Sequence, residues 1–138
     1  MMKAAKEGLA LARWVDSEPI SLAITVLTSM SAEDLSKTGV TRSVTDQVLT
    51  LAKQAKEAGL SGVVASPQEA AMLREVLGPN AYIVTPGVRP AGSDLGDQSR
   101  VATPKEAFDN GASHIVIGRP ITGQVDPGAA FDAIVKEL

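Results

Sequence analysis

The sequence predicts an α/β fold in which parallel strands alternate with helices. Short apolar runs rich in β-branched residues recur at about residues 20–27, 61–65, 81–84 and 114–117. Such continuous apolar runs are typical of strands that are covered on both faces. Helical patterns separate these runs, and several of them end at a glycine. Alternation of this kind implies parallel strands joined by right-handed crossovers.

The starts of the helices carry the clearest local signals. Residues 66–69 and 103–106 both place a hydroxyl residue as the cap, proline at the first helical position and glutamate two positions later. Ser31 predicts a shorter capped turn, and Asp126 opens the last helix. A helix over residues 3–14 has no cap before it, which suggests that the chain begins inside an element.

Length and composition limit the classes of protein that fit. The chain has 138 residues, 44% of them apolar, which suits one ordinary globular domain. The net charge of −3 offers no basic surface for nucleic acid. No run is long enough to cross a membrane and none is of signal-peptide type, so we expect a soluble cytoplasmic protein. With no cysteine and one histidine, we expect no metal site and no cofactor.

Two of the predicted strands end in a glycine followed closely by an arginine. Gly87 and Arg89 follow one strand, Gly118 and Arg119 follow the next, and Gln98 lies on the long loop between them. Glycine lets backbone N–H groups approach an anion, and the arginine fork matches phosphate oxygens. We therefore predict a phosphate site at the carboxyl ends of two neighbouring strands. The alternative interpretation is two buried strands with ordinary turn residues.

The arginine after the last strand also bears on the architecture. A closed (β/α)8 barrel needs about 250 residues, and its phosphate site is commonly built from the loops after its last two strands. The chain has roughly half that length, so we predict one partial domain over residues 1–138. We expect half of a (β/α)8 barrel with four parallel strands and flanking helices. An open doubly wound sheet is the alternative.

The same segments carry a resemblance to a known family. Residues 85–90 (Thr-Pro-Gly-Val-Arg-Pro), 96–100 (Gly-Asp-Gln-Ser-Arg) and 115–122 (Ile-Val-Ile-Gly-Arg-Pro-Ile-Thr) together resemble orotidine 5′-phosphate decarboxylase of the bacterial type. The match is to the carboxyl-terminal half, because residues 23–30 resemble the family's fifth strand and residues 63–66 its sixth. The resemblance implies a homodimeric lyase of pyrimidine biosynthesis that converts orotidine 5′-monophosphate to uridine 5′-monophosphate and carbon dioxide.

The resemblance also implies which residues bind the phosphate. Arg119 matches the arginine that holds the 5′-phosphate, with the Gly118 backbone beside it. Arg89 matches a second phosphate contact. Gln98 matches the glutamine of the closing loop, which grips the phosphate and reaches toward the pyrimidine. The simpler alternative for Gln98 is a solvated loop residue.

Two further residues match the part of the family's site that holds the base. Thr28 matches the residue at the end of the fifth strand that hydrogen-bonds the pyrimidine. Pro86 matches a proline that lines the pyrimidine pocket. Thr28 has a simpler alternative as a residue that merely ends a strand. His114 opens a strand, on the side of a barrel that serves stability, and we interpret it as structural.

The sequence departs from the family in its reacting groups. The family's chemistry depends on an Asp-x-Lys-x-x-Asp motif, and no lysine here has an aspartate two residues before it and another three after it. We therefore expect the isolated chain to be inactive. A truncated gene product, a split subunit and a deliberate fragment all fit this pattern. The alternative functions are a non-catalytic nucleotide-binding module or scaffold and, less favoured, a sugar-phosphate lyase of the same superfamily.

Half a barrel would leave its first and last strands unpaired at the outer side. Unpaired strand edges and exposed apolar faces promote association with another chain. We therefore expect a homo-oligomer, most simply a two-fold dimer.

Overall fold

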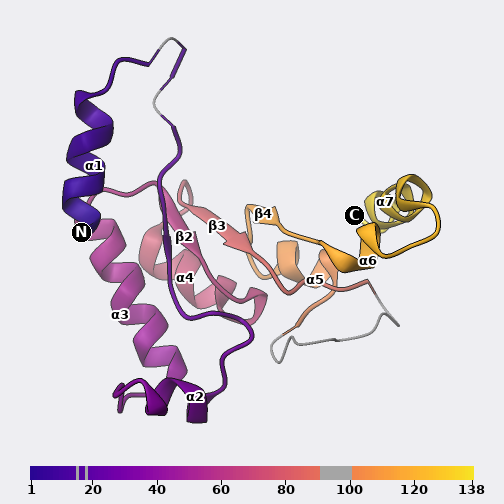
Figure 1. Ribbon diagram of the computed structural model, residues 1–138, viewed down its shortest axis with the longest axis horizontal. Helices are drawn as coiled ribbons and strands as arrows, with labels where there is room; N and C mark the ends of the chain where they lie inside the picture. The colour runs from indigo at the N-terminus through magenta and orange to yellow at the C-terminus, as the bar shows by residue number, and fades with distance from the viewer. Residues whose placement is uncertain (15, 18, 91–100) are drawn as a thin grey trace.

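The computed structural model describes residues 1–14, 16–17, 19–90 and 101–138, and within them strands and helices alternate as the sequence predicts (Figure 1). The elements are α1 (Met2–Leu11), β1 (Leu22–Ile24), α2 (Ala32–Lys37), α3 (Val44–Glu57), β2 (Gly62–Val64), the 3₁₀ turn η1 (Pro67–Glu69), α4 (Ala70–Leu77), β3 (Tyr82–Thr85), α5 (Pro104–Asp109), β4 (His114–Ile115), α6 (Arg119–Thr122) and α7 (Pro127–Lys136).

The four strands form one sheet in chain order, β1-β2-β3-β4, and every neighbouring pair is parallel. The register places Ala23 beside Val63 and Val63 beside Ile83, so the three residues form one row. The predicted α/β fold with four parallel strands and flanking helices is confirmed. Sequential order without crossing is the strand order of a (β/α)8 barrel, in which each strand pairs with the next along the chain.

The strands are shorter than the apolar runs that predict them. The run over residues 20–27 forms a strand only over Leu22–Ile24, and the run over 114–117 only over His114–Ile115. A strand extends only as far as its backbone pairs with a neighbouring strand, and only three residues of β1 pair with β2. The first helix is also shorter than predicted, because Ala12 takes extended backbone with φ −76° and ψ 149°.

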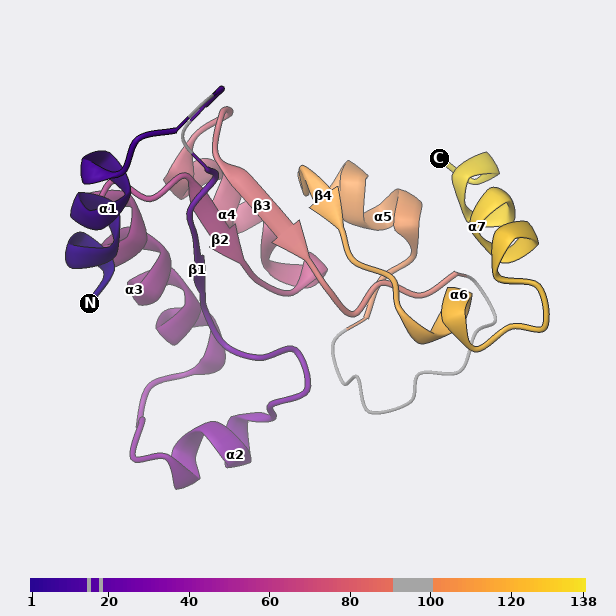
Figure 2. The same ribbon diagram turned by 45° about the horizontal axis from the view of Figure 1, so that its top comes forward.

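Helices cover one face of the sheet, and among the described elements no helix packs on the other face (Figure 2). Alternation along the strands turns Ala23, Val63 and Ile83 toward α3 and α4, and all three are buried. Ala52 and Ala55 of α3 have small side chains, so this helix packs closely on the sheet. A second, smaller core joins Val88 to α5 through Ala107 and Ala112. The hydrophobic core therefore lies between the sheet and its helices.

The predicted caps at Ser31, Ser66 and Thr103 form complete capping boxes, and the Asp126 carboxylate caps the last helix by accepting from Ala129 N. The Ser31 hydroxyl accepts from Asp34 N, and the Thr103 hydroxyl accepts from Glu106 N, while each carboxylate accepts from the cap residue in return. The backbone N–H of Thr103, followed by its hydroxyl, holds the pKa of Glu106 below its usual value of 4.5. The Ser31 hydroxyl, followed by the backbone N–H of Ser31, likewise lowers the pKa of Asp34.

Arg74 forms a set of hydrogen bonds at the amino-terminal end of the sheet. Its guanidinium donates to the Gly111 carbonyl with Nε at 3.2 Å and Nη2 at 2.7 Å. Nη1 donates to the carbonyls of Gly78, Pro79 and Ala81, the last at 2.7 Å. One side chain of α4 thereby joins the segments that lead into β3 and β4. Charge-assisted bonds of this kind are stronger than neutral ones.

Gly62 is the position where the sheet tolerates no side chain. A Cβ there would lie 1.9 Å from the Tyr82 carbonyl oxygen of the neighbouring strand. We predict that Gly62→Ala lowers the free energy of unfolding by about 1–3 kcal/mol, the usual cost of overpacking. Gly8→Ala is the control: Gly8 lies inside α1 with no atom near the added Cβ, so this change should gain about 0.5–1 kcal/mol. Urea unfolding at one protein concentration measures both, and equal stability of Gly62→Ala and wild type would contradict the prediction.

The capping box of α5 predicts a dependence of stability on pH. Because the folded pKa of Glu106 is lowered, its contribution is fully present above the ordinary pKa of 4.5 and is lost as pH falls through the folded pKa. Glu106→Gln keeps a side chain that can complete the box but does not titrate. We expect its unfolding free energy to fall less than that of wild type between pH 5 and acid pH. Glu75→Gln on α4 is the charge-matched control, and parallel pH profiles of wild type and Glu106→Gln would contradict the assignment.

Candidate functional site

The candidate site lies at the carboxyl end of the sheet. Because all four strands are parallel, the segments that follow them emerge at the same end of the sheet. These segments are residues 25–29, 65–66, 86–89 and 116–119. Five of the six predicted site residues lie in the first, third and last of these segments: Thr28, Pro86, Arg89, Gly118 and Arg119.

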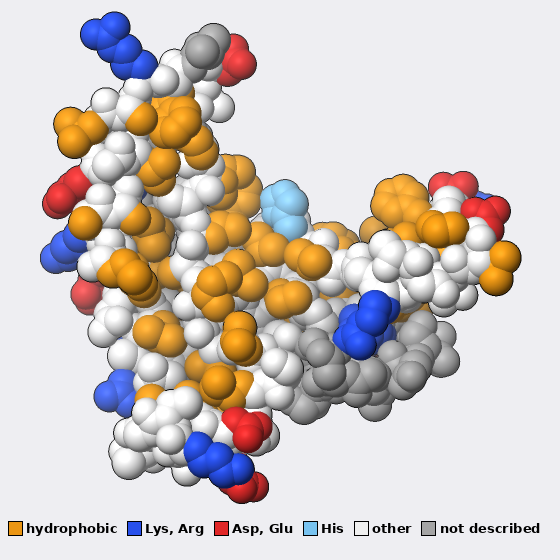
Figure 3. Space-filling view, in the orientation of Figure 1, with side chains coloured by type: hydrophobic (Ala, Val, Ile, Leu, Met, Phe, Trp, Pro, Cys, Tyr) orange, Lys and Arg blue, Asp and Glu red, His pale blue; other side chains and the backbone are white. Residues whose placement is uncertain are grey.

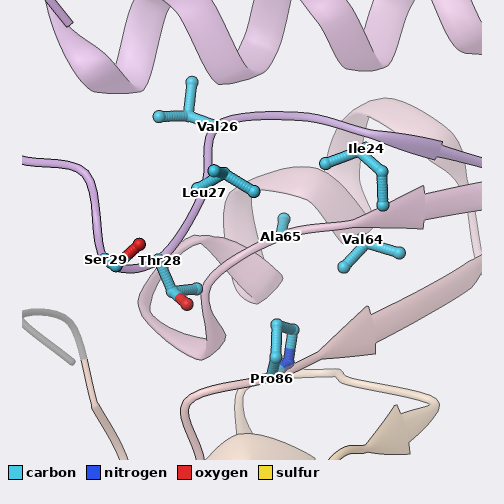
Figure 4. Close-up of a pocket in the computed structure, with 8 residues that line it drawn as sticks. All are labelled: Ile24, Val26, Leu27, Thr28, Ser29, Val64, Ala65 and Pro86. Atoms are coloured by element: carbon cyan, nitrogen blue, oxygen red, sulfur yellow. The ribbon is translucent and has the colours of Figure 1, made fainter. Parts of the chain in front are cut away.

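Thr28 and Pro86 line one pocket, although 57 positions separate them along the sequence. The pocket has a volume of about 230 Å³, and Figure 4 shows both side chains at its walls. Thr28 is buried, and Ser29 adds a second hydroxyl. The remaining lining is apolar and comes from Ile24, Val26, Leu27, Val64 and Ala65. An apolar hollow with a hydroxyl at its wall suits a flat heterocycle that makes a small number of hydrogen bonds.

Arg89 lies after β3 and is buried to a degree unusual for an arginine, with 8% of its surface exposed. Gly87 takes a φ of +78°, a conformation that favours glycine, and turns the chain just before it. The Arg89 backbone N–H donates to the Ala102 carbonyl at 2.9 Å, and its Nη1 donates to the Val88 carbonyl at 2.9 Å. Its backbone is therefore held in place on the edge of the site.

Arg119 follows β4, the strand that pairs with β3, so the two arginines follow neighbouring strands. It is exposed and is the first residue of α6, a short helix that the sequence reasoning did not predict. The Gly118 carbonyl accepts from the backbone N–H groups of Ile121 and Thr122. A Cβ at Gly118 would meet no atom within 4 Å, so there is open space beside the backbone at this point.

Gln98 lies outside the described residues. The structure does describe both flanks of its loop. Val88 and Ala102 form a parallel bridge, and the Gln68 side-chain amide donates to the Val101 carbonyl at 3.3 Å. Sequence reasoning placed Gln68 only in a helix start and missed this link, because its partner lies 33 residues away.

Other kinds of site find no support in the described part of the chain. It contains no group of three His, Cys, Asp or Glu side chains placed to hold a metal ion. Its helices include none with the length and apolarity that crossing a bilayer requires. His114 packs beside Tyr82 with ring centroids 5.6 Å apart, and its Nδ1 lies 3.1 Å from the Ser113 hydroxyl. These contacts suit the structural role that the sequence suggests for His114.

The sequence comparisons agree with one another on the family. The sequence model of the orotidine 5′-phosphate decarboxylase / HUMPS family matches residues 1–134. Orotidine 5′-phosphate decarboxylase of Pseudoalteromonas atlantica is 54% identical over 134 residues, which is 97% of this chain and 57% of the relative. The enzyme of the same name from Moorella thermoacetica is 57% identical over 121 residues, or 87% of this chain and 48% of the relative.

Solved structures give the same result. The crystal structure of orotidine 5′-phosphate decarboxylase from Lactobacillus acidophilus superposes with a TM-score of 0.82 at 44% identity. That match covers 99% of this chain and 57% of the other. An uncharacterised conserved protein from Geobacillus kaustophilus superposes with a TM-score of 0.78 at 32% identity, again over 57% of its length. The chain therefore spans about half the length of the relatives it matches, and it belongs to the orotidine 5′-phosphate decarboxylase / HUMPS family.

Proposed function

We propose that this chain is the substrate-binding half of an orotidine 5′-phosphate decarboxylase, and that it binds orotidine and uridine 5′-monophosphate. The observation that carries the proposal is that Thr28, Pro86, Arg89 and Arg119 all lie on segments that follow parallel strands at one end of the sheet, with Thr28 and Pro86 in one pocket. Membership of the family supports it, as does the name shared by the curated relatives described above. That shared name also favours the pyrimidine enzyme over a sugar-phosphate lyase.

In this proposal the phosphate lies at the ends of β3 and β4. Arg119 and Arg89 supply charge-assisted hydrogen bonds to its oxygens, and Gln98 adds an amide donor. The open space beside Gly118 leaves its backbone accessible to a phosphate oxygen. Binding energy gathered on a phosphate far from the reacting carbon positions the base.

The base lies in the pocket between the ends of β1 and β3. Thr28 hydrogen-bonds an edge of the pyrimidine, while Pro86 and the aliphatic lining contact its faces. Because the ring is flat and largely apolar on its faces, the aliphatic lining excludes water from the side of the ring that it contacts. Ser29 stands at the same wall and is available as a second hydrogen-bonding group.

The chemical step needs groups that the chain lacks. Loss of carbon dioxide leaves negative charge on C6 of the pyrimidine, which requires a proton donor and an arranged electrostatic environment. The family's Asp-x-Lys-x-x-Asp motif supplies them, and this sequence does not contain it. The second candidate function, a nucleotide-binding module without catalysis, is favoured by the same observation.

We also propose that residues 1–138 act as one partial barrel domain that corresponds to strands five to eight of the family. The chain alone forms a homo-oligomer, most simply a dimer, because β1 and β4 end the sheet on either side. The cytoplasmic location expected from the sequence stays a prediction.

The assignment of the phosphate site predicts the effect of removing Arg119. Arg119→Ala should weaken binding of uridine 5′-monophosphate by about 1.5–3 kcal/mol, the worth of a hydrogen bond to a charged group. Isothermal titration of wild type and variant measures the difference. Arg13→Ala is the control, since it removes the same charge from the segment that leads into the opposite end of β1. Equal affinities of wild type and Arg119→Ala would disprove the assignment.

The missing reacting groups predict an inactive chain. We expect the purified chain to show no decarboxylation of orotidine 5′-monophosphate above the uncatalysed rate. Loss of the substrate's absorbance, followed with protein made in a host that lacks its own enzyme, is the measurement. Turnover that scales with the concentration of the chain would overturn the expectation.

The unpaired strands predict self-association. Light scattering at micromolar concentration should give a mass near twice the 14.3 kDa of one chain. Dilution should dissociate the dimer, because a surface exposed by short strands is small. A mass of 14.3 kDa at every concentration would show that the edges are protected in another way.

A further inference from the structure

Few cations are available to a phosphate at the carboxyl end of the sheet. The segments that follow the four strands contain two, Arg89 and Arg119, and no lysine. Figure 3 shows a largely apolar surface around the pale blue histidine, His114. Because a phosphate has few alternative partners here, its binding depends on how firmly these two arginines are placed.

Arg89 has hydrogen-bond donors that the described residues do not use. Its guanidinium carries five N–H groups. Among the described residues, the Val88 carbonyl accepts from its Nη1 at 2.9 Å. Only 8% of Arg89 is exposed, so its side chain is confined and its reach depends on where the backbone lies. The position of the Arg89 backbone therefore decides whether the remaining donors meet a phosphate.

The backbone of Arg89 is held by a short segment from the other side of the long loop. Its N–H donates to the Ala102 carbonyl at 2.9 Å, and Val88 pairs with Ala102 in a parallel bridge. Val88 is fully buried and lies against Ala107 of α5. The bridge is isolated from the four strands of the sheet, so the sheet does not extend its pairing. Residues 101–102 therefore need a further contact to stay in place.

Gln68 supplies this further contact. Its Nε2 donates to the Val101 carbonyl at 3.3 Å, one residue before the bridge. The carbonyls of two successive residues, Val101 and Ala102, thus accept from Gln68 and Arg89 respectively. A chain of hydrogen bonds runs from the end of β2 to the residue assigned to the phosphate.

The backbone that carries Gln68 is firmly held. Gln68 lies in η1, where Ser66 and Glu69 form a capping box with Ser66 fully buried and Glu69 6% exposed. Pro67 is fully buried as well, and Gln68 N donates to Ser66 Oγ at 3.3 Å. Gln68 itself is exposed. Changing its side chain should therefore remove the contact with Val101 and leave the hydrophobic core intact.

We propose that Gln68 is a positioning residue of the phosphate site, which holds residues 101–102 and through them the backbone of Arg89. The inference rests on the proposed function, because the phosphate is the ligand assigned to Arg89. Gln68 acts through Arg89, so its loss should affect the phosphate and spare the base.

Comparison of a nucleotide with its nucleoside tests this role on the full chain. Gln68→Met keeps the length of the side chain and removes its donor. Uridine 5′-monophosphate should bind this variant about three- to tenfold more weakly than wild type, as expected for one lost hydrogen bond. Uridine, which has no phosphate, should bind both proteins equally. Titrations followed by NMR chemical shifts measure all four affinities.

Gln54→Met is the matched control, because Gln54 is an exposed glutamine near the carboxyl end of α3. It should bind both ligands as wild type does. Equal nucleotide affinities of Gln68→Met and wild type would overturn the proposal. An equal loss of affinity for uridine and for its monophosphate would overturn it too, because the effect would then not be specific to the phosphate.

Hydrogen exchange gives a second readout that needs no ligand. The Arg89 amide donates to the Ala102 carbonyl, so its exchange in Gln68→Met should be about three- to tenfold faster. The Val116 amide, which donates to the Thr85 carbonyl at 3.0 Å, is the internal control and should exchange at the wild-type rate. Urea unfolding with an unchanged midpoint shows that the variant keeps its fold. An unchanged exchange rate at Arg89 would overturn the proposal.

The outcomes separate this inference from the proposed function. A wild-type chain that does not bind uridine 5′-monophosphate would overturn the proposed function, and the role of Gln68 in phosphate binding with it. Nucleotide binding by wild type, with unchanged affinity and exchange in Gln68→Met, would overturn this inference alone. Faster exchange at Arg89 with unchanged nucleotide affinity would also overturn it, because Gln68 would then support the backbone without serving the phosphate site.

Discussion

Parallel pairing of four short strands is the constraint on which the site depends. The strands contribute only two to four residues each, yet their register sends the segments that follow them to one end of the sheet. Gly62 allows β2 to lie close to β3, because a Cβ at this position would clash with the Tyr82 carbonyl oxygen. Arg74 fixes the opposite end by binding the Gly111 and Ala81 carbonyls. This geometry brings residues that are distant in the sequence, such as Thr28 and Pro86, to one pocket.

The two faces of the sheet differ in how far their side chains are buried. Toward the helices, Val63 and Ile83 are fully buried in a closely packed core of small and branched side chains. On the other side, Ile24, the last residue of the edge strand β1, is more than half exposed. Covering an apolar sheet face stabilises the assembly by about 25 cal/mol for each Å² of apolar surface removed from water. Association is thus favoured by the face whose residues Ile24 and Val64 also line the pocket that contains Thr28 and Pro86.

Local patterns predicted the elements well and their limits less well. The caps at Ser31 and Thr103 form as expected, because a capping box depends only on residues three positions apart. The first strand was predicted too long, since pairing with β2 and not hydrophobicity sets its ends. The helix α6 was missed because Gly118 and Pro120 resemble the end of an element, although proline is also common in a first helical turn. Arg74 could not be found at all, because its main partner lies 37 residues away.

The roles expected of the site residues came from the family resemblance. In that resemblance this chain carries the groups that bind the substrate, and the groups that react are missing from it. Groups that hold the phosphate and the base need only a rigid edge of parallel strands, and the described chain has one. Stabilising a developing carbanion needs charges fixed close to the ring, and this sequence lacks the family's motif that carries them. Binding contacts that are equal in ground and transition states do not accelerate the chemical step. Under the proposed function, contacts to the phosphate and the base are therefore enough for binding, and the chemical step requires the additional groups of the family's motif, which this sequence lacks.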